Sequence, residues 1–353
     1  MQRTAGPADD LPTLTGRRPR LGPDRLVGDL VPPPQFAAVS FDSYVPDPAQ
    51  PSQARAVEVL REHAGRVGDQ GRRGGLRGLL GGGREPAGPA GVYLDGGFGV
   101  GKTHLLAALW HAAPGPKVFG TFVEYTNLVG ALGFRPAVDA LCGTRLVCID
   151  EFELDDPGDT VMMARLLREL VDAGVRLATT SNTLPDAQGE GRFDADDFLR
   201  EIQAVAGHFT VHRIDGDDYR HRGLPQPPPP LADAALGPAA AAAGATLDDF
   251  DRLLAHLGEL HPSRYGALLD GVAAVAWRGV QRVDDQNVAL RLVVLADRMY
   301  DRDLPLLVSG APLDTVFAEP LLAGGYRKKY RRALSRLGAL ARLGAGERGR
   351  RPH

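Results

Sequence analysis

Short apolar runs alternate with helical patterns over the first two thirds of the chain. Three segments have helical patterns, residues 51–64, 102–112 and 162–174. Five apolar runs have the length of buried strands: residues 91–94, 117–122, 145–150, 175–181 and 209–215. Strands that alternate with helices are typical of a parallel sheet with helices on both faces. The pattern therefore predicts an α/β fold.

Changes in composition predict the domain boundaries. Residues 1–35 are rich in Pro, Gly, Arg and Asp without an apolar period, which is typical of a disordered lead-in. Residues 224–245 are rich in Pro and Ala and are interpreted as a linker. The linker separates a first α/β domain, residues 36–223, from a second α/β segment, residues 246–337. A basic tail, residues 338–353, follows.

The second segment repeats the alternation on a smaller scale. We expect helices at residues 250–260 and 289–301, and strands at residues 271–283 and 304–310. A basic helix begins near Tyr326, and its apolar face favours docking onto a core. Contact of this helix with acidic partners, anionic lipid or nucleic acid is the alternative.

Composition and charge exclude several classes of protein. The 353 residues are 43% hydrophobic, which excludes a wholly disordered chain. The net charge of −3 predicts neither a nucleic-acid binder nor a membrane-surface protein. Two cysteines make no disulfide framework, residues 1–20 lack the apolar core of a signal peptide, and no stretch approaches the roughly 18 apolar residues of a membrane span. We expect a cytoplasmic protein that is at most peripheral to a membrane.

The sharpest chemical signal is a G-x-x-x-x-G-K-T motif between strand 91–94 and helix 102–112. Glycines let a loop turn its backbone N–H groups towards phosphate, and a helix N-terminus adds partial positive charge. A glycine-rich turn is the alternative, but it does not explain the Lys-Thr pair. The candidate nucleotide-binding residues are Gly96, Gly97, Phe98, Gly99, Val100, Gly101, Lys102, Thr103 and the adjacent His104. Lys102 is expected on the outer phosphates and Thr103 on Mg²⁺.

Polar residues lie at the ends of two of the later strands. Asp150 and Glu151 end strand 145–150, where paired carboxylates are costly without a partner. Mg²⁺ bound to nucleotide is such a partner, so Asp150 is predicted to hold the metal through water and Glu151 to polarise an attacking water. Asn182 follows strand 175–181 and is a candidate to orient that water or to contact the γ-phosphate, although a turn or cap residue is equally compatible.

These motifs resemble the ZapE family of cell-division ATPases, a branch of the AAA+ P-loop proteins. The matching stretches run from about Phe41 to Leu337 and include FDSYVPDPAQPSQARAV, GVYLDGGFGVGKTHLL, CIDEFELDDPGDTVMMARLL, TTSNTLPD and LADRMYDRDLPLLVSG. The resemblance implies a P-loop ATPase core followed by a lid-like α/β segment, and it identifies Asn182 as the sensor asparagine. It further implies hydrolysis of Mg²⁺-ATP in a homo-oligomeric ring, coupled to a protein partner. In bacterial relatives that partner is FtsZ, at the division site on the inner face of the membrane.

The arginines depart from the family pattern. Where relatives carry an R-x-R-F-like element, this chain has Ala195 and Asp197, and the nearest arginines are Arg192 and Arg200. No residue is therefore assigned to activation by a neighbouring subunit. Arg332 and Arg336 match an arginine-containing stretch of the family and are candidates for sensing the γ-phosphate. A solvated or partner-facing helix surface is the alternative for both.

Three functions stay open at this point. The first is an ATPase that remodels a protein partner in cell division. The second is a loader-type ATPase on nucleic acid, which the basic tail favours although the net charge does not. The third is a slow nucleotide-binding switch, should the missing arginines limit turnover. A small-molecule kinase fits less well, because the Asp-Glu pair indicates water as the nucleophile.

Overall fold

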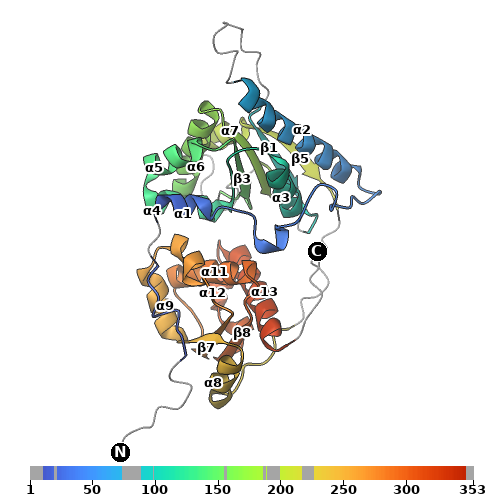
Figure 1. Cartoon of the computed structure of the whole chain (residues 1–353). Helices are drawn as coiled ribbons and strands as arrows, with labels where there is room; N and C mark the ends of the chain where they lie inside the picture. Colours follow the sequence, from blue (N-terminus) through green and yellow to red (C-terminus); the bar gives the residue numbers. More distant parts are fainter. Residues whose placement is uncertain are drawn as a thin grey trace, which may run out of the picture. The chain divides into compact units, whose positions relative to one another are not determined.

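A computed structural model describes residues 11–19, 22–73, 89–97, 99–154, 157–185, 188, 199–216 and 226–346. The chain divides into two compact units (Figure 1). Residues 22–222 form the first, here called the P-loop unit. The second, here called the C-terminal unit, combines residues 1–21 with residues 223–352.

The P-loop unit is built on a parallel sheet in the order β2-β3-β4-β1-β5. Its strands are β1 (Gly91–Gly96), β2 (Lys117–Thr121), β3 (Leu146–Asp150), β4 (Arg176–Ser181) and β5 (Phe209–Ile214). These are the five runs expected from the sequence, so the predicted α/β fold is confirmed. Because β4 lies between β1 and β3, the glycine-rich loop and the acidic strand end flank the end of β4 at one edge of the sheet.

Helices cover both faces of this sheet (Figure 1). On one face lie α2 (Pro51–Arg73) and α3 (Lys102–Ala112). On the other lie α4 (Phe122–Leu132), α5 (Phe134–Cys142), α6 (Pro157–Asp172) and α7 (Leu199–Ala206). Side chains of β1 alternate between these layers: Leu94 joins the core under α2 and α3, whereas Tyr93 packs edge-on against Phe152. Strand β1 is therefore buried on both sides.

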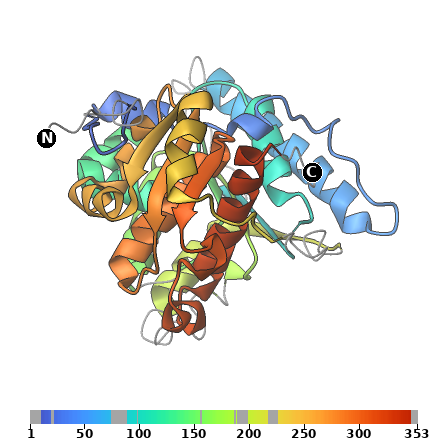
Figure 2. The ribbon, with the colours of Figure 1, turned by 90° about the horizontal axis from the view of Figure 1, so that it is seen from below.

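The C-terminal unit has a parallel sheet of β6 (Ala245–Asp249), β7 (Ala274–Val280) and β8 (Leu306–Gly310). One face is covered by α8 (Asp233–Ala242). The helices of the other layer are α9 (Phe250–Glu259), α10 (Tyr265–Leu268), α11 (Gln286–Asp301), α12 (Glu319–Ala323) and α13 (Arg327–Gly344). Figure 2 shows α13, in dark red, beside the orange strands, and it packs on α11 and β8. The expected second α/β segment is present.

The predicted disordered lead-in is wrong for the described part of residues 1–35. A short helix, α1 (Pro23–Gly28), forms there, and the carbonyl of Leu30 accepts a hydrogen bond of 2.8 Å from the N–H of Phe119 on β2. Residues 11–19 dock onto the C-terminal unit, where Leu14 is fully buried in the core. The apolar residues of this segment follow no helical or strand period, so no pattern could be detected in the sequence. Leu14, Leu26 and Leu30 are nevertheless buried.

A buried carboxylate holds residues 11–19 in place. Asp248, which is 1% exposed, accepts bonds of 2.9 Å from the N–H of Leu14, the N–H of Thr15 and the Thr15 hydroxyl. The carbonyl of Pro12 accepts from the N–H of Leu247, so the segment runs along the edge of β6. Hydrogen bonds to a charged group are stronger than neutral ones, and here one carboxylate orders the segment.

The predicted linker and basic tail are also wrong over the residues described. Within residues 224–245, Leu231 bonds the carbonyl of Val308 at 2.8 Å, α8 follows, and β6 begins. Alanine is the best helix former, which explains why an Ala-rich stretch folds as α8. Within residues 338–353, α13 continues to Gly344 and buries Leu340 in the core. None of the helices described has the length and apolar character needed to cross a bilayer.

Replacing Asp248 by Ala should release residues 11–19. Each charge-assisted hydrogen bond is worth about 1.5–3 kcal/mol, so losing even one raises the undocked population about tenfold or more. We expect at least that increase in the rate of tryptic cleavage after Arg17 under native conditions. Asp314→Ala, at an exposed position of the same unit, is the control. Equal cleavage rates in the two variants would contradict this account of the segment.

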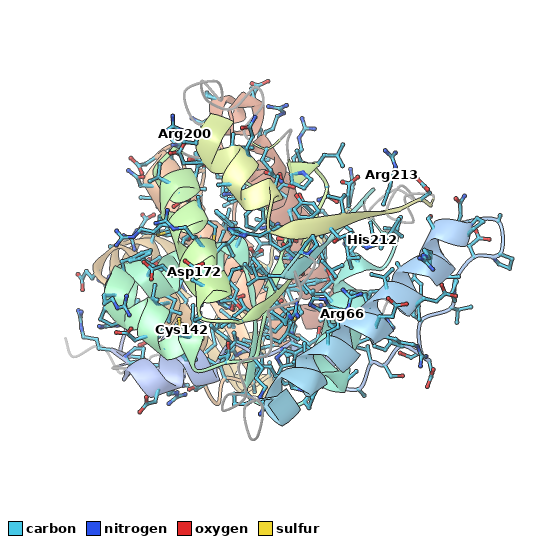
Figure 3. The ribbon with its side chains drawn as sticks, turned by 90° about the horizontal axis from the view of Figure 1, so that it is seen from above. Arg66, Cys142, Asp172, Arg200, His212 and Arg213 are labelled. Carbon is cyan, nitrogen blue, oxygen red and sulfur yellow. The ribbon has the colours of Figure 1, made fainter. Side chains whose placement is uncertain are left out.

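A buried histidine predicts acid sensitivity of the P-loop unit. Burial of His63 on α2 lowers the pKa of its imidazole to about 4, and the nearby charges of Arg176 and Arg66 act in the same direction (Figure 3 labels Arg66). The folded state thus holds His63 neutral, whereas the unfolded chain takes up a proton below about pH 6.5. Stability from this group is complete above that pH and is lost as the pH falls towards 4.

We therefore expect the stability difference between the unaltered protein and His63→Leu to depend on pH. Between pH 7 and pH 5 it should shift by about 2 kcal/mol in favour of the variant, because the variant has no imidazole to protonate. Urea unfolding of the full chain at the two pH values measures this shift. A difference that stays constant would show that His63 is not the titrating group.

Candidate nucleotide-binding site

The glycine-rich loop adopts a conformation that requires glycine. Between β1 and α3, Gly99 and Gly101 have φ angles of 81° and 86°, in the left-handed region. A Cβ atom on Gly101 would lie 2.6 Å from Cε2 of Tyr44, whose hydroxyl donates to the carbonyl of Val100 at 2.9 Å. Tyr44 therefore covers the loop from the segment before α2, a contact that the sequence did not indicate. Phe98 lies outside the described residues.

Lys102, the first residue of α3, reaches back over the loop. Its Nζ donates to the carbonyls of Gly96 at 2.7 Å and Gly97 at 2.6 Å, and to Oδ1 of Asn182 at 2.9 Å. The structure thus brings together two side chains, Lys102 and Asn182, that the sequence analysis named separately. A cation and an amide meet where the loop is shaped for phosphate.

Asp150, at the end of β3, is the most constrained acid of the site. The carboxylate is buried and accepts from the Thr103 hydroxyl, with oxygen–oxygen distances of 3.0 and 3.2 Å. The Thr180 hydroxyl donates to Oδ1 as well. Burial, followed by the neighbouring charge of Glu151, raises the pKa of Asp150 above its ordinary value. Thr103 and Asp150, which the sequence analysis assigned to the same metal ion, thus lie in contact, and their role in metal binding stays a prediction.

Glu151 follows in an unusual backbone conformation. Its φ is 53°, which is uncommon for a residue other than glycine, and its N–H donates to the Thr180 hydroxyl at 3.1 Å. Such strain persists only where surrounding contacts fix it, and it concentrates at functional sites. This backbone conformation therefore determines the direction of the Glu151 side chain at the end of β3.

Two polar side chains that the sequence analysis missed tie the loops together. Glu153 accepts from the Ser181 hydroxyl at 3.2 Å, the Asn182 N–H at 3.4 Å and the Thr183 hydroxyl at 3.2 Å. Gln188 is buried, accepts from the N–H of Leu154 at 2.9 Å, and its amide nitrogen lies 3.1 Å from Ser181 Oγ. The loops that carry Glu151 and Asn182 are thereby joined. Single polar residues in loops give no sequence signal for such contacts.

The remaining candidates lie elsewhere. His104 contacts Ser43 Oγ through Nε2 at 2.9 Å, on the Tyr44 side of the loop. Arg332 and Arg336 lie on α13 of the C-terminal unit and both pair with Asp297, Arg332 at 3.2 Å. Although burial acts in the opposite direction, the two guanidinium groups hold the pKa of Asp297 below its usual range. Phosphate sensing by these arginines stays a prediction.

The segment aligned with the family's arginine-containing element is only partly described. Residues 192, 195 and 197 lie outside the described ranges. Arg200 is exposed on α7 (Figure 3).

Comparison with known proteins agrees with this geometry. A family model of AFG1-like ATPases matches residues 22–237 and 232–345. The chain belongs to the AFG1-like ATPase family. The P-loop ATPase fold expected from the sequence is confirmed by this match and by the parallel sheet.

Curated relatives resemble this AFG1-like ATPase over part of their length. Cell division protein ZapE of Escherichia coli K12 is 29% identical over 208 residues, which cover 54% of this chain and 56% of ZapE. An uncharacterized protein of Schizosaccharomyces pombe is 28% identical over 154 residues, 38% of this chain and 34% of that protein. The chain therefore spans about half, or less, of the relatives that it matches.

Solved structures match this chain only at low similarity. The replication initiator DnaA bound to AMPPCP and single-stranded DNA has a TM-score of 0.39 and 14% identity, covering 52% of this chain and 51% of its own. The DnaC helicase loader has a TM-score of 0.34 and 15% identity, covering 51% of this chain and 99% of its own.

Two glycines of the loop, Gly101 and Gly97, should differ in their tolerance of a methyl group. Gly101→Ala places a side chain in the left-handed region and against Tyr44, so we expect a loss of about 2 kcal/mol or more in stability. Gly97 has neither constraint, and Gly97→Ala should stay within about 0.5 kcal/mol. Denaturant unfolding of both variants tests this, and equal losses would argue against the Tyr44 contact.

Proposed function

We propose that this AFG1-like ATPase hydrolyses ATP at the P-loop, with water as the nucleophile. The observation that carries the proposal is that two side-chain contacts lie together at the carboxyl ends of the strands. Lys102 contacts Asn182, and Thr103 contacts Asp150. Helix α3 supplies one member of each pair, and its N-terminus is the place where backbone N–H groups receive phosphate.

The residues present fit a magnesium ion. Mg²⁺ prefers oxygen ligands, and the Thr103 hydroxyl and the Asp150 carboxylate lie in contact. Asp150 is buried with a raised pKa, so its charged form lacks full compensation within the protein. When bound, Mg²⁺ would neutralise charge on the phosphates during transfer.

The chain's own residues divide the chemistry. Lys102 exchanges the carbonyls of Gly96 and Gly97 for the outer phosphate oxygens, and its ammonium stabilises the charge that develops there. Glu151 accepts a proton from the attacking water. Asn182, fixed through its N–H by Glu153, orients that water through its amide. His104 is not required for these steps.

We further propose that hydrolysis drives remodelling of a protein partner in bacterial cell division. The similarity to ZapE supports this role, with the FtsZ ring as partner, a homo-oligomer as the working form, and recruitment to the division site from the cytoplasm. The nucleic-acid loader and the slow switch are the functions against which this proposal is tested.

The chemical proposal is tested by ATPase assays on the full chain. Glu151→Gln should lower kcat by about 100-fold or more while nucleotide binding is retained, because only the proton acceptor is lost. Lys102→Ala should abolish binding itself. Glu58→Gln, at an exposed position on α2, is the matched control and should behave as the unaltered protein. Undiminished hydrolysis by Glu151→Gln would contradict the role of Glu151.

The partner is tested by turnover and co-sedimentation with polymerised FtsZ or with single-stranded DNA. Stimulation by FtsZ that requires Glu151 supports the cell-division role. Stimulation by DNA, with binding that falls steeply as salt rises, supports the loader. Tight nucleotide binding with slow turnover under every condition supports the switch.

A further inference from the structure

Two adjacent threonines of β4 donate hydrogen bonds from their hydroxyls to residues of the neighbouring strand β3. Thr179 and Thr180 are both buried. The Thr179 hydroxyl donates to the carbonyl of Ile149 at 2.8 Å, a bond between the strands that touches neither acidic side chain. The Thr180 hydroxyl instead donates to Oδ1 of Asp150 and accepts the N–H of Glu151. One side chain thus contacts two successive residues of the candidate site.

The donor side of this hydroxyl fixes the Asp150 carboxylate. A hydroxyl has one hydrogen and accepts through its lone pairs, so the contacts of Thr180 are compatible with each other. With Thr180 on Oδ1 and Thr103 within 3.0 Å of Oδ2, rotation of the carboxylate about its bond to Cβ would break a hydrogen bond. Without the Thr180 hydroxyl, Oδ1 would lose this buried donor.

The acceptor side fixes the turn at Glu151. A left-handed backbone costs a residue other than glycine about 1–2 kcal/mol. The bond from the Glu151 N–H to Thr180 Oγ1 offsets part of this cost and anchors the turn to β4. The same hydroxyl therefore determines how the metal ligand and the water-activating acid are placed relative to each other.

We propose that Thr180 is a positioning residue for hydrolysis, which holds the Asp150 carboxylate for Mg²⁺ and the Glu151 backbone for water activation. The proposal rests on the function proposed above. Replacing a residue that hydrogen-bonds to a metal ligand typically lowers metal affinity or activity 10- to 100-fold.

Thr179 provides the matched control. Thr179→Val and Thr180→Val each remove one buried hydroxyl from the same strand and keep the branched shape. A merely structural role of Thr180 predicts similar behaviour of the two variants. A positioning role predicts that they differ in kcat and in magnesium requirement.

The experiment compares these variants in the full chain by three measurements. They are kcat and KM for ATP, the Mg²⁺ concentration for half-maximal binding of a fluorescent, non-hydrolysable ATP analogue, and thermal unfolding. For Thr180→Val we expect kcat to fall about 10- to 100-fold with a smaller change in KM, and half-saturation to need about tenfold more Mg²⁺. Thr180→Ser should restore both. Thr179→Val should change only thermal stability.

Should Thr180→Val not fold, Thr180→Ala and Thr180→Ser, which differ by one oxygen atom, replace the comparison. Equal kcat and equal magnesium requirement in the presence and absence of that oxygen would overturn the proposal. If Glu151→Gln is still inactive in that case, the proposed function stands without it. If the unaltered chain hydrolyses no ATP, the proposed function fails, and the binding measurement alone decides whether Thr180 orders the magnesium site.

Discussion

The buried carboxylate of Asp150 is the interaction on which the site depends. Removing a carboxylate from water costs several kcal/mol unless it is hydrogen-bonded and paired. Here the hydroxyls of Thr103, from α3, and Thr180, from β4, both donate to it. Three elements of the P-loop unit therefore meet at one charge. Two neutral donors compensate only weakly for a buried anion. A bound cation would stabilise this carboxylate further.

The rest of the site is built so that this meeting point stays rigid. Tyr44 braces the glycine-rich loop from the segment before α2, and Gln188 and Glu153 join the loops that follow β3 and β4. A shift of about 1 Å in a catalytic group costs up to about 100-fold in rate. The contacts of Tyr44, Gln188 and Glu153 therefore make these residues part of the candidate site, although they lie outside the motif. The left-handed backbone of the non-glycine residue Glu151 is held by a separate contact, the bond from its N–H to the Thr180 hydroxyl.

Local patterns explain what the sequence could predict. The strands of the P-loop unit follow from short apolar runs, and the motif before α3 is recognisable because its glycines, lysine and threonine all lie between Gly96 and Thr103. Tyr44 and Thr180 could not be recognised, because their partners are distant in sequence or lie on another strand. Docking of residues 11–19 depends on Leu14 and Asp248, which are 234 residues apart. The composition of this segment suggested disorder, because composition does not show that a distant residue such as Asp248 binds the segment.

The proline-rich stretches show why composition misled. In three places a proline, or a residue within two positions of one, makes the hydrogen bond that covers a sheet edge. Leu30 precedes Val31 and three prolines and bonds β2, Pro12 bonds β6, and Leu231 follows four prolines and bonds β8. An uncovered edge is a template for aggregation, and proline has no N–H to extend the ladder to another chain. Segments of this kind cover an edge with few bonds and end the sheet there. The composition that suggests a linker is thus also the composition that terminates a sheet, and only the partner strand distinguishes the two.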